Sequence, residues 1–165
     1  MIDRDLASQA GRGIKNLNFI WYTMLGFLAV YFLAGMFLKG SLRHSPRDPA
    51  FLSTLRWTLY FVSAGTFFLA CLFKRMLMGS KRVLKGWTQV TERQQHPAVA
   101  RYTTAVVISL ALAESIGIYG LILYFFKGDV ADLVSLIVLS AVAMILCRPR
   151  REELLGLMKR ETLAE

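Results

Sequence analysis

The sequence predicts an all-helical integral membrane protein, built as a bundle of four transmembrane helices. Hydrophobic residues make up 55% of the 165 residues, and charged residues only 19%. The apolar residues fall into four blocks of 18 to 23 residues, close to the length that a helix needs to cross a hydrocarbon core about 30 Å thick. The blocks lack the strict in-out alternation of barrel strands. Because a backbone in hydrocarbon must satisfy its own hydrogen bonds, each block is expected to be a helix.

The first span is expected at residues 18–38. Trp21 and Tyr22 lie near its start, where amphipathic rings favour the headgroup layer. Residues 1–17 carry several charges and are expected to form a cytoplasmic N-terminal segment. The apolar stretch is too long for a cleaved signal peptide and has no small-residue cleavage site, so it should remain as a span.

The second span is expected at residues 54–73. Pro46 and Pro49 lie in the connection before it and break any helix there, because proline lacks the backbone N–H and restricts the residue that precedes it. Arg56 and Trp57 lie in the first turn of the span, where the arginine can extend toward the interface. A basic stretch follows the end of the span.

The third and fourth spans are expected at residues 104–126 and 130–147, joined by a tight turn. The fourth span has 18 residues and only just crosses the bilayer. The four spans form a transmembrane domain over residues 18–147. The segment 148–165 is expected to be a cytoplasmic tail that forms a short amphipathic helix.

The distribution of basic residues predicts the orientation. Fifteen of the twenty Lys and Arg residues lie on the side that carries both termini. The positive-inside rule therefore places both termini in the cytoplasm of a cell membrane, as in a bacterial inner membrane. The net charge of +9 suits anionic lipid headgroups better than nucleic acid. An alternative is that the basic stretch after the second span binds a partner or a specific lipid. The cations expected at the headgroups are Lys74, Arg75, Lys81, Arg82, Lys85, Arg148, Arg150 and Arg151.

The sequence contains no pattern that indicates an enzyme, a metal site or a cofactor. Cys71 and Cys147 have no zinc-binding spacing and are expected to be reduced packing residues at the cytoplasmic boundary. His44 and His96 lie in polar connections, so they are not placed to ligate a haem between spans. Phosphate-binding glycine loops, Gly-x-Ser-x-Gly and His-Glu-x-x-His are absent from the sequence. We therefore expect a non-enzymatic protein without a cofactor.

Glu114 is the residue that most needs an explanation. It is the eleventh of 23 residues in the third expected span, near the middle of the bilayer. A charged acid there costs about 2.5–3.5 kcal/mol, and no base lies at the same depth. Either the carboxyl is protonated and hydrogen-bonded to neutral groups, or it faces water or an ion and titrates. Matching the depths of the spans gives Ser63, Thr66 and Ser140 as possible neutral partners.

Small residues recur beside Glu114 on the same expected helix. Ser109, Ala113 and Gly117 follow one another at four-residue steps, and Gly120 widens the flat face. Small residues let two membrane helices approach closely. The stripe is therefore expected to be a helix packing face.

The third span also has a distinctive order of residues around Glu114. Arg93-Gln94-Gln95-His96-Pro97 precedes the span, Glu114 lies 17 residues after the proline, and Ile118-Tyr119-Gly120-Leu121 follows. Residues 93–123 thereby resemble the second helix of subunit c, the proteolipid ring subunit of F- and V-type ATP synthases. That helix follows a polar Arg-Gln-Pro loop and carries a mid-membrane Glu or Asp. The resemblance implies that Glu114 alternately carries a proton or Na⁺.

Two functions are expected from these residues. The first is an accessory or structural subunit of a larger membrane complex, docked to a membrane protein partner or to further copies of the chain. The alternative is a proton- or cation-handling protein that uses Glu114, as a subunit-c-like ring or a small dimeric transporter. An intramembrane enzyme would need an acid-base pair or a nucleophile-base pair. One Glu with neutral Ser and Thr neighbours supplies neither.

Overall fold

The computed structural model describes residues 2–38, 48–79 and 97–162, and all regular secondary structure in these ranges is helical. The all-helical prediction is therefore confirmed. The helices in chain order are α1 (Ile2–Leu38), α2 (Pro49–Gly79), α3 (Pro97–Lys127), α4 (Val130–Leu146) and α5 (Arg151–Thr162).

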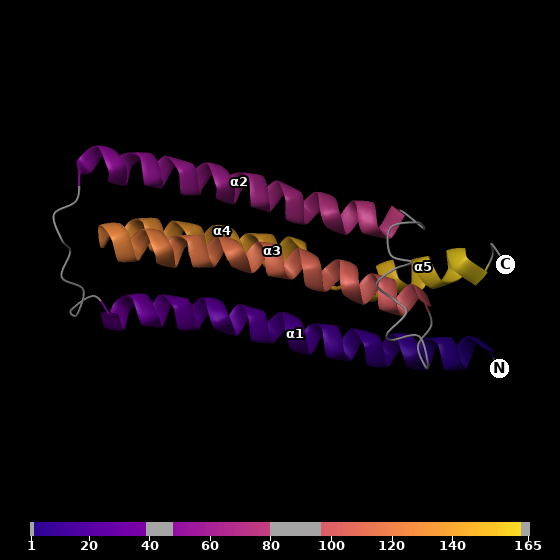
Figure 1. The fold of residues 1–165 in the computed structure, drawn as a ribbon. Helices are drawn as coiled ribbons and strands as arrows, with labels where there is room; N and C mark the ends of the chain where they lie inside the picture. The colour runs from indigo at the N-terminus through magenta and orange to yellow at the C-terminus, as the bar shows by residue number, and fades with distance from the viewer. Residues whose placement is uncertain (1, 39–47, 80–96, 163–165) are drawn as a thin grey trace.

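Helix α3 is the centre of the bundle. It packs against α1, α2 and α4 along its length and also contacts α5 (Figure 1). Its fully buried side chains include Leu110, Ile116 and Leu123. It is the most buried of the long helices, and its exposed residues, such as Ile118 and Phe125, are also apolar, so α3 has no polar face.

Three helices are long and apolar enough to cross a membrane, over Gly13–Leu38, Pro49–Met76 and Val99–Lys127. Helix α4 has 17 residues, and at a rise of 1.5 Å per residue it extends about 25 Å, which is shorter than a hydrocarbon core of about 30 Å. Helices α4 and α5 together are long and apolar enough to cross a membrane, but they are bent by 41° relative to each other. The described residues thus contain three membrane-crossing candidates, or four if α4 and α5 form one bent span.

The outer surface of the bundle is strongly apolar. Within the apolar stretch of each membrane-crossing candidate, only 17% of α1 and 11% of α2 is buried, whereas 44% of α3 is buried. Large side chains such as Phe37 and Phe61 are more than four-fifths exposed. Such a surface is unusual for a soluble monomer, whereas hydrocarbon solvates it without penalty.

Both ends of the described chain lie at the same end of the bundle (Figure 1). Helix α1 begins at Ile2, so the segment before the first expected span continues the same helix. Helix α5 lies at this end as well, beside the end of α2 and the start of α3. We refer to it below as the terminal end, and to the opposite one as the hairpin end.

The turn between α3 and α4 forms where the sequence predicts it. Gly128 has a φ of 74°, a left-handed conformation that glycine adopts without the strain caused by a Cβ atom. Asp129 caps α4, because its side chain accepts a hydrogen bond from the Ala131 N–H at 3.0 Å. These two residues allow α4 to fold directly back against α3.

The small-residue stripe of α3 is buried. Ser109, Ala113, Gly117 and Gly120 all lie in the interior. Ser140 of α4 donates a hydrogen bond to the Ala113 carbonyl at 2.6 Å. At Gly120 an added Cβ would lie 2.9 Å from the Leu136 Cβ and 3.4 Å from the Leu133 carbonyl oxygen. The contact between α3 and α4 therefore depends on the absence of a side chain at this position.

We expect Gly120→Ala to lower the free energy of unfolding by about 1–3 kcal/mol, the usual cost of overpacking. The rigid neighbours of the new methyl group, a Cβ and a backbone carbonyl, would force α3 and α4 apart. Gly65→Ala in α2 is the matched control, because nothing lies within 4 Å of a Cβ there. Unfolding titrations in detergent measure both variants, and equal losses would contradict this packing.

Candidate functional site

Glu114 has a hydrogen-bond partner on α1. The Tyr31 hydroxyl donates to Oε1 of Glu114 at 2.8 Å, and both side chains are half-buried. Gly117 lies nearly one turn beyond Glu114, and its small size gives the Tyr31 ring room. The bond joins the C-terminal part of α1 to the middle of α3, so it ties a flanking helix to the central one.

The three neutral partners expected from depth matching are used differently. Ser140 donates to the Ala113 carbonyl, and Thr66 donates to the Val62 carbonyl at 2.8 Å. Ser63 is buried, and its hydroxyl has no hydrogen-bond partner among the described residues. Serine and threonine in helices readily bond to a carbonyl one turn back, which is what Thr66 does here.

Sequence reasoning missed Tyr31, although a signal for it exists. The first and third expected spans run in the same direction, and Tyr31 is the fourteenth of 21 residues in the first span. Its depth therefore resembles that of Glu114. Depth matching considered only the second and fourth spans, because consecutive spans were expected to be the neighbours of the third.

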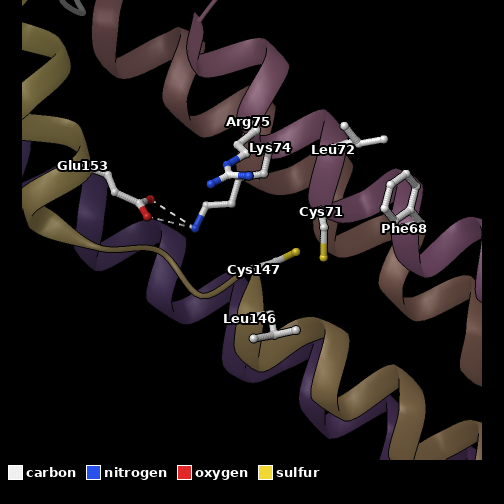
Figure 2. A pocket seen from close by; sticks show the side chains of 8 residues that line it. All are labelled: Phe68, Cys71, Leu72, Lys74, Arg75, Leu146, Cys147 and Glu153. Atoms are coloured by element: carbon white, nitrogen blue, oxygen red, sulfur yellow. Dashed lines mark hydrogen bonds and ion pairs between the residues drawn. The ribbon is translucent and has the colours of Figure 1, made fainter.

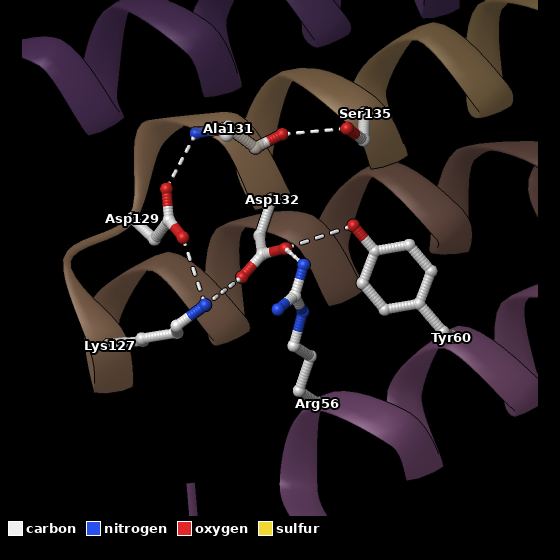
Figure 3. Close-up of polar contacts among 7 residues, drawn as sticks. All are labelled: Arg56, Tyr60, Lys127, Asp129, Ala131, Asp132 and Ser135. Carbon is white, nitrogen blue, oxygen red and sulfur yellow. Dashed lines mark hydrogen bonds and ion pairs between the residues drawn. The ribbon is translucent and has the colours of Figure 1, made fainter. Parts of the chain in front are cut away.

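A second polar site lies at the hairpin end (Figure 3). Asp132 of α4 is buried, with 2% of its side chain exposed. It pairs with Arg56 of α2 at 3.0 Å and with Lys127 of α3 at 2.8 Å, and the Tyr60 hydroxyl donates to it at 3.0 Å. We call these four residues the Asp132 cluster. It joins three helices through one carboxylate.

The charges of the Asp132 cluster differ in their access to solvent. Arg56 and Lys127 are 47% and 26% exposed, so both cations reach the protein surface while Asp132 does not. Taking a carboxylate out of water is expensive unless opposite charges and hydrogen bonds compensate it. Lys127 also contacts Asp129 at 2.9 Å, and together with the Ala131 N–H it lowers the pKa of Asp129. That contact therefore persists until the pH falls below the usual range of an aspartate.

The Asp132 cluster was also missed in the sequence, where Arg56 was expected to extend outward alone. A signal was present, because Arg56 and Asp132 each lie in the first turn of a span that starts from the same side. Charges of opposite sign at the same depth are expected to pair inside a membrane.

A third polar site lies at the terminal end (Figure 2). Lys74 of α2 is only 8% exposed. Its ammonium contacts Oε2 of Glu153 at 3.1 Å and the Arg148 carbonyl at 3.2 Å. Tyr102 of α3 donates to the same carboxylate oxygen at 3.0 Å. Lys74 was expected among the headgroup-facing cations, whereas in the structure its ammonium is paired with Glu153 of α5.

The same region fixes the bend between α4 and α5. The Arg150 N–H donates to the Tyr102 hydroxyl at 2.7 Å. The indole N–H of Trp21 donates to the Met144 carbonyl at 2.9 Å, and the Arg148 guanidinium lies 5.3 Å from the centre of the Trp21 ring. Trp21, expected near the headgroup layer, is thus buried at a helix contact.

The other expected headgroup cations divide into two groups. The side chains of Arg75, Arg148, Arg150 and Arg151 are exposed at the terminal end. Lys81, Arg82 and Lys85 lie outside the described residues. Over the residues that the structure does describe, no three His, Cys, Asp or Glu side chains are grouped so that they could hold a metal ion.

We expect the double variant Arg56→Gln, Lys127→Gln to lower the free energy of unfolding by about 3 kcal/mol, because it leaves the Asp132 carboxylate buried without a cation. Asp132→Asn should cost less, about 1 kcal/mol, since the amide oxygen still accepts from Tyr60 and the freed cations can reach water. Unfolding titrations in mild detergent compare the two. A larger loss of unfolding free energy in Asp132→Asn than in the double variant would contradict this account, because it would show that the unpaired carboxylate is not the main cost.

Comparisons of the chain with protein-family models, with curated proteins and with solved structures give no match. The likeness of residues 93–123 to subunit c stays a prediction. Glu114 with Tyr31, the Asp132 cluster and the Lys74–Glu153 pair are the polar features from which a function can be inferred.

Proposed function

We propose that this protein is a non-catalytic membrane subunit that acts as an accessory or structural part of a larger membrane assembly. The observation that carries the proposal is how the polar side chains within the bundle are used. Tyr31 donates a hydrogen bond to Glu114. Asp132 forms ion pairs with Arg56 and Lys127, and Lys74 forms one with Glu153. Each contact joins different helices, which supports a role in holding a rigid bundle together.

The outer faces of α1 and α2 support the same role. Phe19 and Phe37 of α1, and Trp57 and Phe61 of α2, are each more than 70% exposed. Exposed aromatic side chains offer large and rigid contact areas at a small loss of conformational entropy. In a bilayer these two faces are open to lipid or to the helices of a partner, while α3 is more deeply buried.

The proposed placement has four crossings, with the short α4 as the fourth, in a cell membrane. The terminal end faces the cytoplasm, because fifteen of the twenty basic residues are assigned to that side. Helix α5 then lies at the cytoplasmic boundary, where its exposed basic side chains meet anionic headgroups. The hairpin end faces the opposite side.

A second candidate function, proton or cation handling, is favoured by the state of Glu114. Its carboxyl is half-buried near mid-membrane, and Tyr31 donates to one of its two oxygens. The second oxygen could bind a proton or a small cation. This candidate and the resemblance to subunit c both depend on the same carboxyl.

We expect Glu114→Gln to leave the assembly and its stability near those of the native chain, since the amide oxygen still accepts from Tyr31. Glu114→Leu removes the acceptor and should cost about 0.6 kcal/mol, and at most about 1.7 kcal/mol, the range for hydrogen bonds between membrane helices. Native electrophoresis of gently solubilised membranes reports the assembly. A monomer in the native chain, or a lost assembly in a stable Glu114→Gln protein, would overturn the accessory role.

Carbodiimide labelling separates the two candidate functions. Dicyclohexylcarbodiimide modifies protonated carboxyls in apolar sites, so an ion-handling Glu114 should be labelled in a pH-dependent way. For an accessory subunit we expect the labelling of the folded protein not to change with pH, because a structural carboxyl between α1 and α3 has no need to exchange its proton. Peptide mass spectrometry detects the adduct, with Glu114→Gln as the blank.

A further inference from the structure

The terminal end contains a half-open pocket between α2 and the α4–α5 bend. Its volume is about 520 Å³, which lies within the range of about 300–1,000 Å³ common for ligand pockets. Its apolar lining includes Phe68, Leu72 and Leu146, and its charged lining is Lys74, Arg75 and Glu153. Figure 2 shows the thiols of Cys71 and Cys147 facing each other at its centre.

The apolar and charged linings are separated along α2. Phe68 and Leu72 come first along the helix, toward the middle of the membrane span, and Lys74 and Arg75 lie near its end. A phospholipid has the same polarity, with its acyl chains in the hydrocarbon and its phosphate at the boundary. The polarity of the pocket lining therefore changes along α2 in the same direction as the polarity of a lipid molecule at this surface.

The charges favour an anionic lipid. Lys74 is neutralised by Glu153 at 3.1 Å, which leaves Arg75 as the uncompensated charge of the lining. Arg75 is exposed and has no ion-pair partner in the part of the chain that the structure describes. A guanidinium binds a phosphate through two parallel hydrogen bonds, so one phosphodiester of charge −1 would balance the pocket.

We propose that this pocket binds one anionic phospholipid, with its phosphate on Arg75 and an acyl chain along Phe68, Leu72 and Leu146. The proposal rests on the membrane placement and not on the accessory role. It differs from general attraction to a charged surface because it assigns the headgroup to a single arginine beside a built cavity. Arg151 is a suitable comparison, since it is exposed at the same end and does not line the pocket.

Cys71 reports occupancy of the pocket. It is partly exposed and lines the cavity, while Cys147 is almost completely buried. The full-length protein is placed in nanodiscs of phosphatidylcholine, with or without phosphatidylglycerol of the same acyl chains. Neutral N-ethylmaleimide labels the thiol, and peptide mass spectrometry follows the rate at each cysteine. We expect phosphatidylglycerol to slow the labelling of Cys71 several-fold.

Arg75→Gln and Arg151→Gln each remove one positive charge, so they alter the surface potential equally. We expect Arg75→Gln to abolish the protection by phosphatidylglycerol and Arg151→Gln to retain it. Equal rates in both lipid mixtures, or equal loss of protection in both variants, would overturn the site. Protection by soluble glycerol phosphate in phosphatidylcholine discs would replace the lipid with a simple phosphate site. The size of the assembly tests the accessory role and the labelling of Cys71 tests the lipid site, so either proposal can be contradicted without the other.

Discussion

Hydrocarbon offers no hydrogen bonds, so a bundle that crosses a membrane must pair its buried charged and acidic side chains internally. They meet at three depths: Asp132 with two cations at the hairpin end, Tyr31 with Glu114 in the middle, and Lys74 with Glu153 at the terminal end. The ion pairs lie toward the two ends of the bundle. The single acid at mid-depth is paired with a neutral phenol.

The position of α3 follows from the same constraint. Its stripe of small residues lets α4 approach closely, and Gly117 gives room to Leu28 and Tyr31 of α1. α3 is therefore more deeply buried than α1 and α2, which turn many of their large apolar side chains outward. The bundle thus has a well-ordered interior and an outer surface suited to lipid and to partner helices.

Much of the fold could be predicted from the sequence, but little of the side-chain pairing could. Hydropathy locates the helices, the Gly128 turn and the depth of Glu114, because these depend on position along the chain. It does not determine how each helix is rotated, and rotation decides that Tyr31 faces Glu114 and that Lys74 faces Glu153. Burial of Lys74 also depends on the bend that brings Glu153 of α5 to its ammonium, which the run of basic residues does not reveal.

The central claim is that hydrocarbon surrounds this bundle. A nitroxide at Phe61→Cys, in a chain with Cys71→Ser and Cys147→Ser, tests it in lipid bilayers, because Phe61 is 82% exposed and lies near the middle of α2. Electron paramagnetic resonance compares relaxation by oxygen, which concentrates in the bilayer, with relaxation by a water-soluble nickel chelate. We expect strong relaxation by oxygen and almost none by nickel. Strong relaxation by nickel and little by oxygen would contradict the account.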